Sequence, residues 1–231
     1  MGLTQAPLRA GDDSAGAAMD AAGGHGGWLA TTLSALAFVF SGFSFYMSAL
    51  QQADLEVYVP PVLQYGRDGG GEVDVFAIPI TIANNGANTG TVLAIEVTVS
   101  NTAGGTEKAS KTFYSAFIGE HPRNADTPNK TFAPISVPGR ATYSETIRFY
   151  PQGNPLPKVV SEAGVYTFRL SITIAEPADP GLMDKLFKAR GPAPFTFTRN
   201  LPFISEQHLA FRRGTISMHD KDWKPTASGA K

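Results

Sequence analysis

The residue types that carry most enzyme chemistry are sparse in this 231-residue chain. It has no cysteine, which excludes disulfides, thiolate zinc sites, iron–sulfur clusters and cysteine nucleophiles. It also lacks the Gly-x-Ser-x-Gly nucleophile turn, the phosphate-binding loop, the His-Glu-x-x-His zinc helix and the dinucleotide fingerprint. We therefore expect no catalytic residues and no cofactor, and we predict that the chain is not an enzyme.

Two groups of residues that contain carboxylates could still bind a metal ion or act as acid and base. His219-Asp220-Lys221-Asp222 offers one imidazole and two carboxylates to a metal ion, but this pattern is more typical of a solvated loop. Glu72 and Asp74 share one face of a predicted strand, and such pairs face solvent more often than they act as acid and base. We accordingly predict no metal site.

Aromatic residues in the predicted strands suit a hydrophobic core, and we expect most of them to be buried there. The alternative is that some of them form an exposed row that stacks against a carbohydrate. The set comprises Phe113, Tyr114, Phe117, Tyr143, Phe149, Tyr150, Tyr166 and Phe168.

The chain that must position these residues has parts of very different composition. Residues 1–27 contain seven Gly and seven Ala but no Val, Ile, Phe or Tyr, so they are predicted to be a disordered head. Residues 28–50 contain no charged residue. As a helix this segment is roughly 34 Å long, enough to cross a hydrocarbon core of roughly 30 Å. We predict one transmembrane helix over 28–50.

The apolar segment differs from a cleaved signal peptide. It is longer than the roughly 7–15 apolar residues of such a peptide, and Met47 occupies a position that a cleavage site fills with a small residue. We therefore predict an uncleaved signal anchor in a single-pass protein of the cell membrane. Arg9 and Arg67 nearly balance the positive charges on its two sides. The short head favours a cytoplasmic N-terminus and an extracytoplasmic domain, periplasmic if the source is bacterial.

Small residues recur along the predicted helix at spacings of four and three, the period of a left-handed helix pair. Small side chains permit close contact between helices, and serine hydroxyls can hydrogen-bond across the contact. We predict a homo-oligomer, or contact with another membrane protein, through this face; the alternative is a stripe that faces lipid. We call it the small-residue seam: Ala30, Ser34, Ala37, Ser41, Ser44 and Ser48.

Residues 51–217 alternate short β-rich runs with Gly, Pro and Asn, which predicts an all-β domain with the architecture of an Ig-like antiparallel β-sandwich. Pro79 predicts either an edge position or a bulge in its strand. Residues 67–71 predict a flexible turn, and Asn84-Asn85-Gly86 predicts a tight turn. The predicted strands cover residues 55–59, 73–83, 91–99, 110–118, 141–150, 164–175 and 194–199, with a further strand at 209–217.

Three stretches carry a family resemblance: ITIANNG from Ile80, PISVPGRATYSETIRF from Pro134 and EAGVYTFRLSITI from Glu162. Over roughly residues 75–175 this pattern resembles bacterial Ig-like modules of the cell-adhesion-related type. The resemblance implies a sandwich fold and assigns no activity. The paired cysteines of many Ig domains are absent.

The two parts of the chain after the helix differ in net charge. Residues 51–184 hold nine Lys or Arg against 14 Asp or Glu, whereas 185–231 hold nine against three. The chain as a whole has a net charge of -1, which argues against a nucleic-acid binder that relies on bulk basicity. The basic part from 185 either packs on the sandwich or forms a patch that binds anionic lipid or an acidic partner. That patch would comprise Lys185, Lys188, Arg190, Arg212 and Arg213.

The residues beyond 217 are predicted to be a flexible tail over 218–231. Together these features indicate a membrane-anchored, non-catalytic interaction or assembly protein that presents an extracytoplasmic β-sandwich. The alternative function is a sensor whose sandwich binds a ligand or a carbohydrate on a membrane anchor. An exposed aromatic row would favour the second function, and a defined protein partner the first.

Overall fold

The computed structural model describes residues 23–68, 71–101, 110–121, 128–153, 159–176, 189, 191–211 and 214–222. The chain separates into two units between Ser48 and Ala49. Each unit is described by itself. The basic patch predicted at Lys185, Lys188, Arg190, Arg212 and Arg213 lies outside the described residues, as do the predicted disordered head up to residue 22 and the tail from 223.

The described residues of the N-terminal unit form a single helix. α1 spans Gly23–Phe45 and continues into a π-helical turn, η1, at Tyr46–Leu50. Its 24-residue section Gly27–Leu50 is long and apolar enough to cross a membrane, and the rest of the described chain buries none of its most apolar window. Phe38, for example, is 81% exposed. The predicted apolar helix of membrane-spanning length is confirmed.

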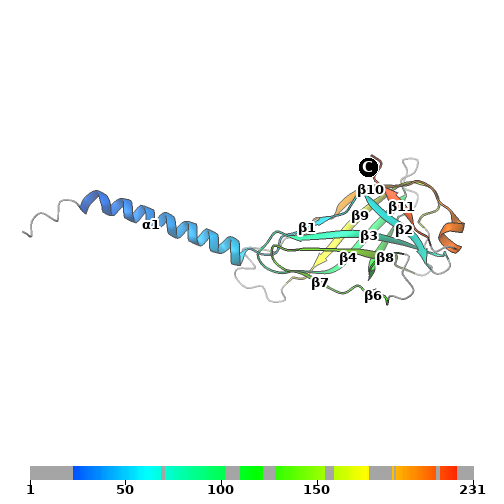
Figure 1. Ribbon diagram of the computed structural model, residues 1–231, viewed down its shortest axis with the longest axis horizontal. Helices are drawn as coiled ribbons and strands as arrows, with labels where there is room; N and C mark the ends of the chain where they lie inside the picture. Colours follow the sequence, from blue (N-terminus) through cyan, green and yellow to red (C-terminus); the bar gives the residue numbers. More distant parts are fainter. Residues whose placement is uncertain are drawn as a thin grey trace, which may run out of the picture. The chain divides into compact units, whose positions relative to one another are not determined.

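The second unit consists almost entirely of β-strands (Figure 1). The strands are β1 (Leu55–Tyr58), β2 (Val62–Asp68), β3 (Val73–Asn84), β4 (Gly90–Asn101), β5 (Ser110–Ile118), β6 (Lys130–Thr131), β7 (Ile135–Val137), β8 (Thr142–Pro151), β9 (Gly164–Ile174), β10 (Phe195–Leu201) and β11 (Ile216–His219). A π-helical turn, η2, spans Gln207–Phe211.

The strands form one antiparallel sheet that closes on itself into a barrel. Eight strands make the ring in the order β5, β8, β3, β2, β11, β10, β9, β4 and back to β5. The short strands β1, β6 and β7 are added to β3, β5 and β4. The domain is all-β as predicted. The predicted Ig-like β-sandwich, and the resemblance to bacterial Ig-like modules on which it partly rested, are wrong.

Strand β5 closes the ring, and bulges allow the sheet to curve. Tyr114 of β5 pairs with Glu96 of β4 on one edge and with Tyr150 of β8 on the other. The register shifts between Ser115 and Phe117 in β5, and again between Val92 and Ala94 in β4. Bulges bend and twist a strand, and such curvature lets a sheet meet its own edge. Alternation of apolar residues does not reveal them, so the sequence did not distinguish a barrel from a sandwich.

The interior of the barrel is a packed core. Phe76, Ile78, Ile80 and Ile82 of β3 point inward and are almost completely buried. The ring of Phe76 meets Phe113 edge-on at a centroid distance of 5.0 Å. An eight-stranded barrel is just wide enough for side chains to fill it. The barrel therefore has a core and no lumen.

The predicted aromatic core is only half correct. The residues of the set that lie inside are Phe113, Phe149, Tyr166 and Phe168. Tyr143 is half-buried and packs against the edge of this core. The other three lie on outward-facing positions: Tyr114 is exposed, and Phe117 and Tyr150 are half-buried. Alternate residues of a strand point to opposite faces, so a strand rich in aromatic residues places some of them outside.

The inward row of β3 ends in a polar residue at each end, Asp74 at its start and Asn84 at its finish. The Asn84 amide nitrogen donates to the carbonyl oxygens of Asn88 (2.8 Å) and Val137 (3.0 Å). Its amide oxygen accepts from the backbone N–H of Asp54 (3.2 Å). One buried side chain thus joins three separate segments of the chain at this end of the barrel.

The turns beside Asn84 use glycine because backbones approach closely there. A Cβ on Gly139 would lie 1.8 Å from the carbonyl oxygen of Ala87, and a Cβ on Gly86 would lie 2.0 Å from that of Gln52. The positive φ expected of these turns falls instead on Arg140, at 56°. The chain bends at the predicted Asn84-Asn85-Gly86 turn, but a five-residue connection, 85–89, leads to β4, which does not pair with β3.

Pro79 lies where the ladder on one edge of β3 is interrupted. Tyr58 of β1 pairs with Thr81, and Gln64 of β2 pairs with Ala77. Residues 59–63 therefore lie between these pairs on one side and 78–80 on the other, so Pro79 faces the break between β1 and β2. Proline has no backbone N–H to donate to a ladder, which suits this place. Pro79 thus lies at a local edge of the sheet, one of the two predicted alternatives.

Two segments differ from their predicted structure. Arg67 and Asp68, assigned to a flexible turn, are the last residues of β2, a strand that was not predicted. Residues 209–217, assigned to a strand, contain the end of η2 and the start of β11. The buried face of β2 carries charge at Arg67, which breaks the apolar pattern by which strands are recognised.

We predict that Asn84→Ala destabilises the barrel by about 1–3 kcal/mol, because the Asp54 N–H and the carbonyls of Asn88 and Val137 lose a buried partner. Urea unfolding of the full chain in detergent, followed by circular dichroism, measures the change. Asn85→Ala is the matched control, since the neighbouring Asn85 is exposed and should cost less than about 0.5 kcal/mol. Equal losses in the two variants would contradict the role of Asn84.

Candidate functional site

The barrel holds a charged pair at the end opposite Asn84. Arg67 on β2 and Asp74 on β3 are direct cross-strand partners, and both side chains are buried. Opposite charges in this position stabilise an antiparallel pair, provided that their remaining hydrogen bonds are satisfied. The arrangement corrects the expectation that Asp74 faces solvent with Glu72; only Glu72 is exposed.

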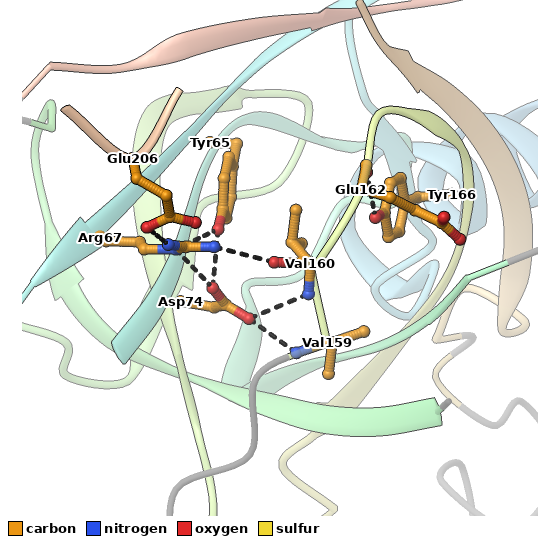
Figure 2. A network of polar contacts seen from close by, with 8 residues as sticks. All are labelled: Tyr65, Arg67, Asp74, Val159, Val160, Glu162, Tyr166 and Glu206. Carbon is orange, nitrogen blue, oxygen red and sulfur yellow. Dashed lines mark hydrogen bonds and ion pairs between the residues drawn. The ribbon is translucent and has the colours of Figure 1, made fainter. Parts of the chain in front are cut away.

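Figure 2 shows how these two charges are matched. One Asp74 carboxylate oxygen accepts from the Tyr65 hydroxyl (2.7 Å) and from Arg67 Nε (3.3 Å). The other accepts from the backbone N–H groups of Val159 (2.8 Å) and Val160 (3.1 Å). Both carboxylate oxygens are therefore fully engaged. A substrate would have to displace a protein group to reach Asp74.

The guanidinium of Arg67 is matched in the same way (Figure 2). Its Nη1 donates to Glu206 (2.5 Å) and its Nη2 to the carbonyl oxygen of Val160 (2.9 Å). Burial disfavours its charge, but the hydrogen bond to Glu206 and the neighbouring Tyr65 and Asp74 outweigh that effect and raise the pKa of Arg67. Burial, followed by the charge of Asp74, also raises the pKa of Tyr65. These groups stay in one protonation state, so the network closes the barrel and is not suited to proton transfer.

A second polar site lies on the outer surface, where β2, β3, β8 and β11 run side by side. It is a cavity of about 350 Å³, and we call it the outer cavity. Its lining residues are Gln64, Ala77, Pro79, Glu120, His121, Thr146 and Thr215. The small residues Ala77 and Pro79 of β3 leave the space that the loop carrying His121 covers.

His121 is the unusual group in the outer cavity. Its side chain is only 3% exposed, yet neither ring nitrogen has a hydrogen-bond partner among the described residues. Burial lowers the pKa of His121 and the charge of Arg148 lowers it further, whereas Asp68 opposes them. The ring is therefore neutral at pH 7 and carries one donor and one acceptor. An unmatched buried polar group is costly, which marks this position as a place for a bound molecule.

The surroundings of His121 are built closely around the ring. A Cβ on Gly66 would lie 2.4 Å from His121 Cδ2, so the ring packs where β2 has no side chain. Asp68 lies 4.0 Å from Nε2, beyond hydrogen-bond distance, and its carboxylate accepts instead from the Tyr150 hydroxyl. Asp68 does not orient the ring as the acid of a catalytic dyad would.

The other sequence-predicted sites are dispersed. Asp220 of the acidic group at 219–222 forms an ion pair with Arg199 (3.6 Å), and no group of three metal-binding side chains occurs in the part of the chain that the structure describes. The small-residue seam lies on α1 and η1 and all its members are exposed: Ala30, Ser34, Ala37, Ser41, Ser44 and Ser48. Ser48 lies in the wider π turn, so α-helical spacing holds only as far as Ser44.

Sequence reasoning missed the two groups that matter most in the barrel. The alternation of Leu63, Tyr65 and Arg67 opposite Asp74 is a readable signal of a hairpin with a buried charge pair. His121 offered no such signal. It lies in a long connection, and only tertiary packing brings it over Gly66.

Comparisons with known proteins add little. No family model matches the chain, and no curated protein matches it. One similar solved structure is a crystal structure described as ApaA from Bordetella pertussis, with 15% identity over 75% of this chain and 99% of that chain and a TM-score of 0.30. A TM-score this low supports no conclusion on fold or function. Function is therefore inferred from geometry.

We predict that Arg67→Met destabilises the barrel by about 3–5 kcal/mol, because it leaves the Asp74 carboxylate buried without its cation. The side chains have similar length, so lost packing contributes little. Glu206→Gln is the control: that side chain is 69% exposed, and its loss should cost less than about 1 kcal/mol. Urea unfolding measures the stability of both variants. An equal or smaller loss of unfolding free energy in Arg67→Met than in Glu206→Gln would contradict this assignment.

We also predict a pH dependence from His121. Its pKa is lowered in the folded state, so the unfolded chain binds a proton near pH 6.5 that the folded chain does not. Stability should therefore decrease as the pH falls below about 6.5, by at most about 1.4 kcal/mol per pH unit. His121→Gln should remove this contribution of His121 to the pH dependence of stability. Identical pH slopes for variant and wild type would contradict the prediction.

Proposed function

We propose that this chain is a single-pass, membrane-anchored and non-catalytic interaction or assembly protein that presents its β-barrel outside the cytoplasm. The observation that carries the proposal is the uncovered helix Gly27–Leu50, which has no charged residue. Exposing such a surface to water costs about 25 cal/mol per Å² of apolar area. A membrane removes that cost, and Trp28 and Tyr46 near the helix ends suit its two interfaces.

The orientation follows from the segments on either side of the helix. Residues 1–27 carry one Arg against three Asp, and the barrel unit after the helix is large. Large domains are exported largely regardless of charge, so the barrel can lie on the extracytoplasmic side. The barrel would then face the periplasm in a bacterial cell.

The architecture of the barrel supports a role in binding rather than in transport. Its interior is filled by a continuous core, and buried polar groups join the loops at both ends, Asn84 at one and Asp74 at the other. A partner can therefore meet only the outer surface of the barrel or the helix. The small-residue seam is the face of the helix best suited to close packing, either with a second copy or with another membrane protein.

A second candidate function, a ligand-binding sensor on a membrane anchor, is favoured by one specific observation. The outer cavity contains a buried histidine whose hydrogen-bonding groups are unmatched among the described residues. The exposed aromatic row proposed for carbohydrate binding receives less support, since half of that set is buried.

Because the chain has no cysteine, single introduced cysteines report helix contacts without background. We predict that Ala37→Cys, within the seam, gives a disulfide-linked homodimer or a defined larger adduct when membranes containing the full chain are oxidised. Ala35→Cys is the matched control, because at about 100° per residue it faces away from the seam. It should give little adduct.

Two results would contradict the proposal. Recovery of the full chain in the soluble fraction would remove the membrane anchor. Equal crosslinking from positions 35 and 37, or none from either together with a clean monomer in mild detergent, would remove the seam as an interface.

A further inference from the structure

The outer cavity has a composition that an anchoring or assembly role does not require. Its floor is apolar, made by Ala77 and Pro79, and its walls carry the hydroxyls of Thr146 and Thr215. The buried ring of His121 closes one side. At about 350 Å³ it lies at the small end of the range for ligand pockets, roughly 300–1,000 Å³.

The charges around the outer cavity argue against an ionic ligand. An anion would face the carboxylates of Glu120, in the lining, and Asp68, beside His121. The neighbouring Arg148 donates from Nη2 to Asn129 (3.0 Å), and its guanidinium lies 4.9 Å from the centre of the Phe117 ring. Its buried Nε has no partner among the described residues, but Arg148 is not part of the cavity lining. A metal ion would need more ligands than one imidazole and distant carboxylates, and the described residues hold no group of three. An uncharged ligand fits best.

We propose that the outer cavity binds a neutral, hydroxyl-rich molecule of the size of one sugar ring, with a ring nitrogen of His121 as one of its hydrogen-bond partners. Each hydroxyl group is both donor and acceptor, as are the neutral imidazole and the hydroxyls of Thr146 and Thr215. The C–H face of such a ring packs on Ala77 and Pro79. The site belongs to the barrel alone, so it stands or falls independently of the membrane anchor.

The test uses the full chain in detergent, with ¹⁵N-labelled histidine, titrated separately with glucose, N-acetylglucosamine, sodium sulfate and zinc chloride. His121→Gln identifies the His121 signals. A neutral sugar should shift the His121 ring nitrogens saturably, whereas sulfate and zinc should not. A methyl glycoside and a linear oligosaccharide then distinguish a free sugar from a sugar unit within a chain.

Two variants test the geometry. Thr146→Val should weaken sugar binding by about tenfold through loss of one hydroxyl, whereas Thr142→Val, an exposed position on the same strand, should leave it unchanged. Gly66→Ala should abolish binding, because the added Cβ would displace the His121 ring.

Three outcomes would overturn the proposal while the barrel remains folded by circular dichroism. The first is no response of His121 to any neutral sugar, with a crystal structure in which ordered water alone contacts its ring. The second is saturation by sulfate or zinc in place of sugar. The third is equal affinity in the Thr146→Val and Thr142→Val variants.

Discussion

The ion pair between Arg67 and Asp74 places two charges inside the barrel, where water cannot match them. The protein must therefore supply the partners, and they come from three places: Tyr65 on β2, the segment 159–160, and Glu206 before η2. Buried charges cost several kcal/mol each unless they are paired and hydrogen-bonded. As a result, the β2–β3 hairpin and the segment 159–160 hold one another in place, whereas the largely exposed Glu206 contributes less.

Strand β3 connects this buried ion pair to the opposite end of the barrel. Its inward row runs from Asp74 through an unbroken apolar stretch to Asn84, so the same strand organises both ends of the core. Its outward row has the opposite character near the middle, where Ala77 and Pro79 are small and the ladder with β1 and β2 is interrupted. The inward-facing residues of β3 therefore belong to the packed core, and its outward-facing residues line the outer cavity together with His121. A fold that seals its interior in this way presents its binding chemistry on the outer surface.

Much of the local structure follows from residue patterns. The uncharged run predicts the apolar helix, and period-two alternation predicts strands such as Ser110–Ile118 and Gly164–Ile174 with nearly correct bounds. Strand β2 was missed because the buried Arg67 and the partly exposed Asp68 look like turn residues unless their partners are known. The Ig-like prediction failed for a related reason. Strand count and turn spacing are shared by sandwiches and barrels, whereas the difference lies in bulges near Ala116 and Leu93 that let β5 pair with both β4 and β8.

The sequence by itself determined the apolar helix, the all-β character of the domain and the bounds of strands such as β5 and β9. These features depend on neighbours along the chain, for which periodicity and residue type are sufficient. Only the tertiary structure decided the closure of the barrel, the burial of Asp74 and the position of His121 over Gly66. Each of those depends on which distant groups meet. The free energy of a buried charge or an unmatched imidazole is set by its surroundings in space, which no local pattern encodes.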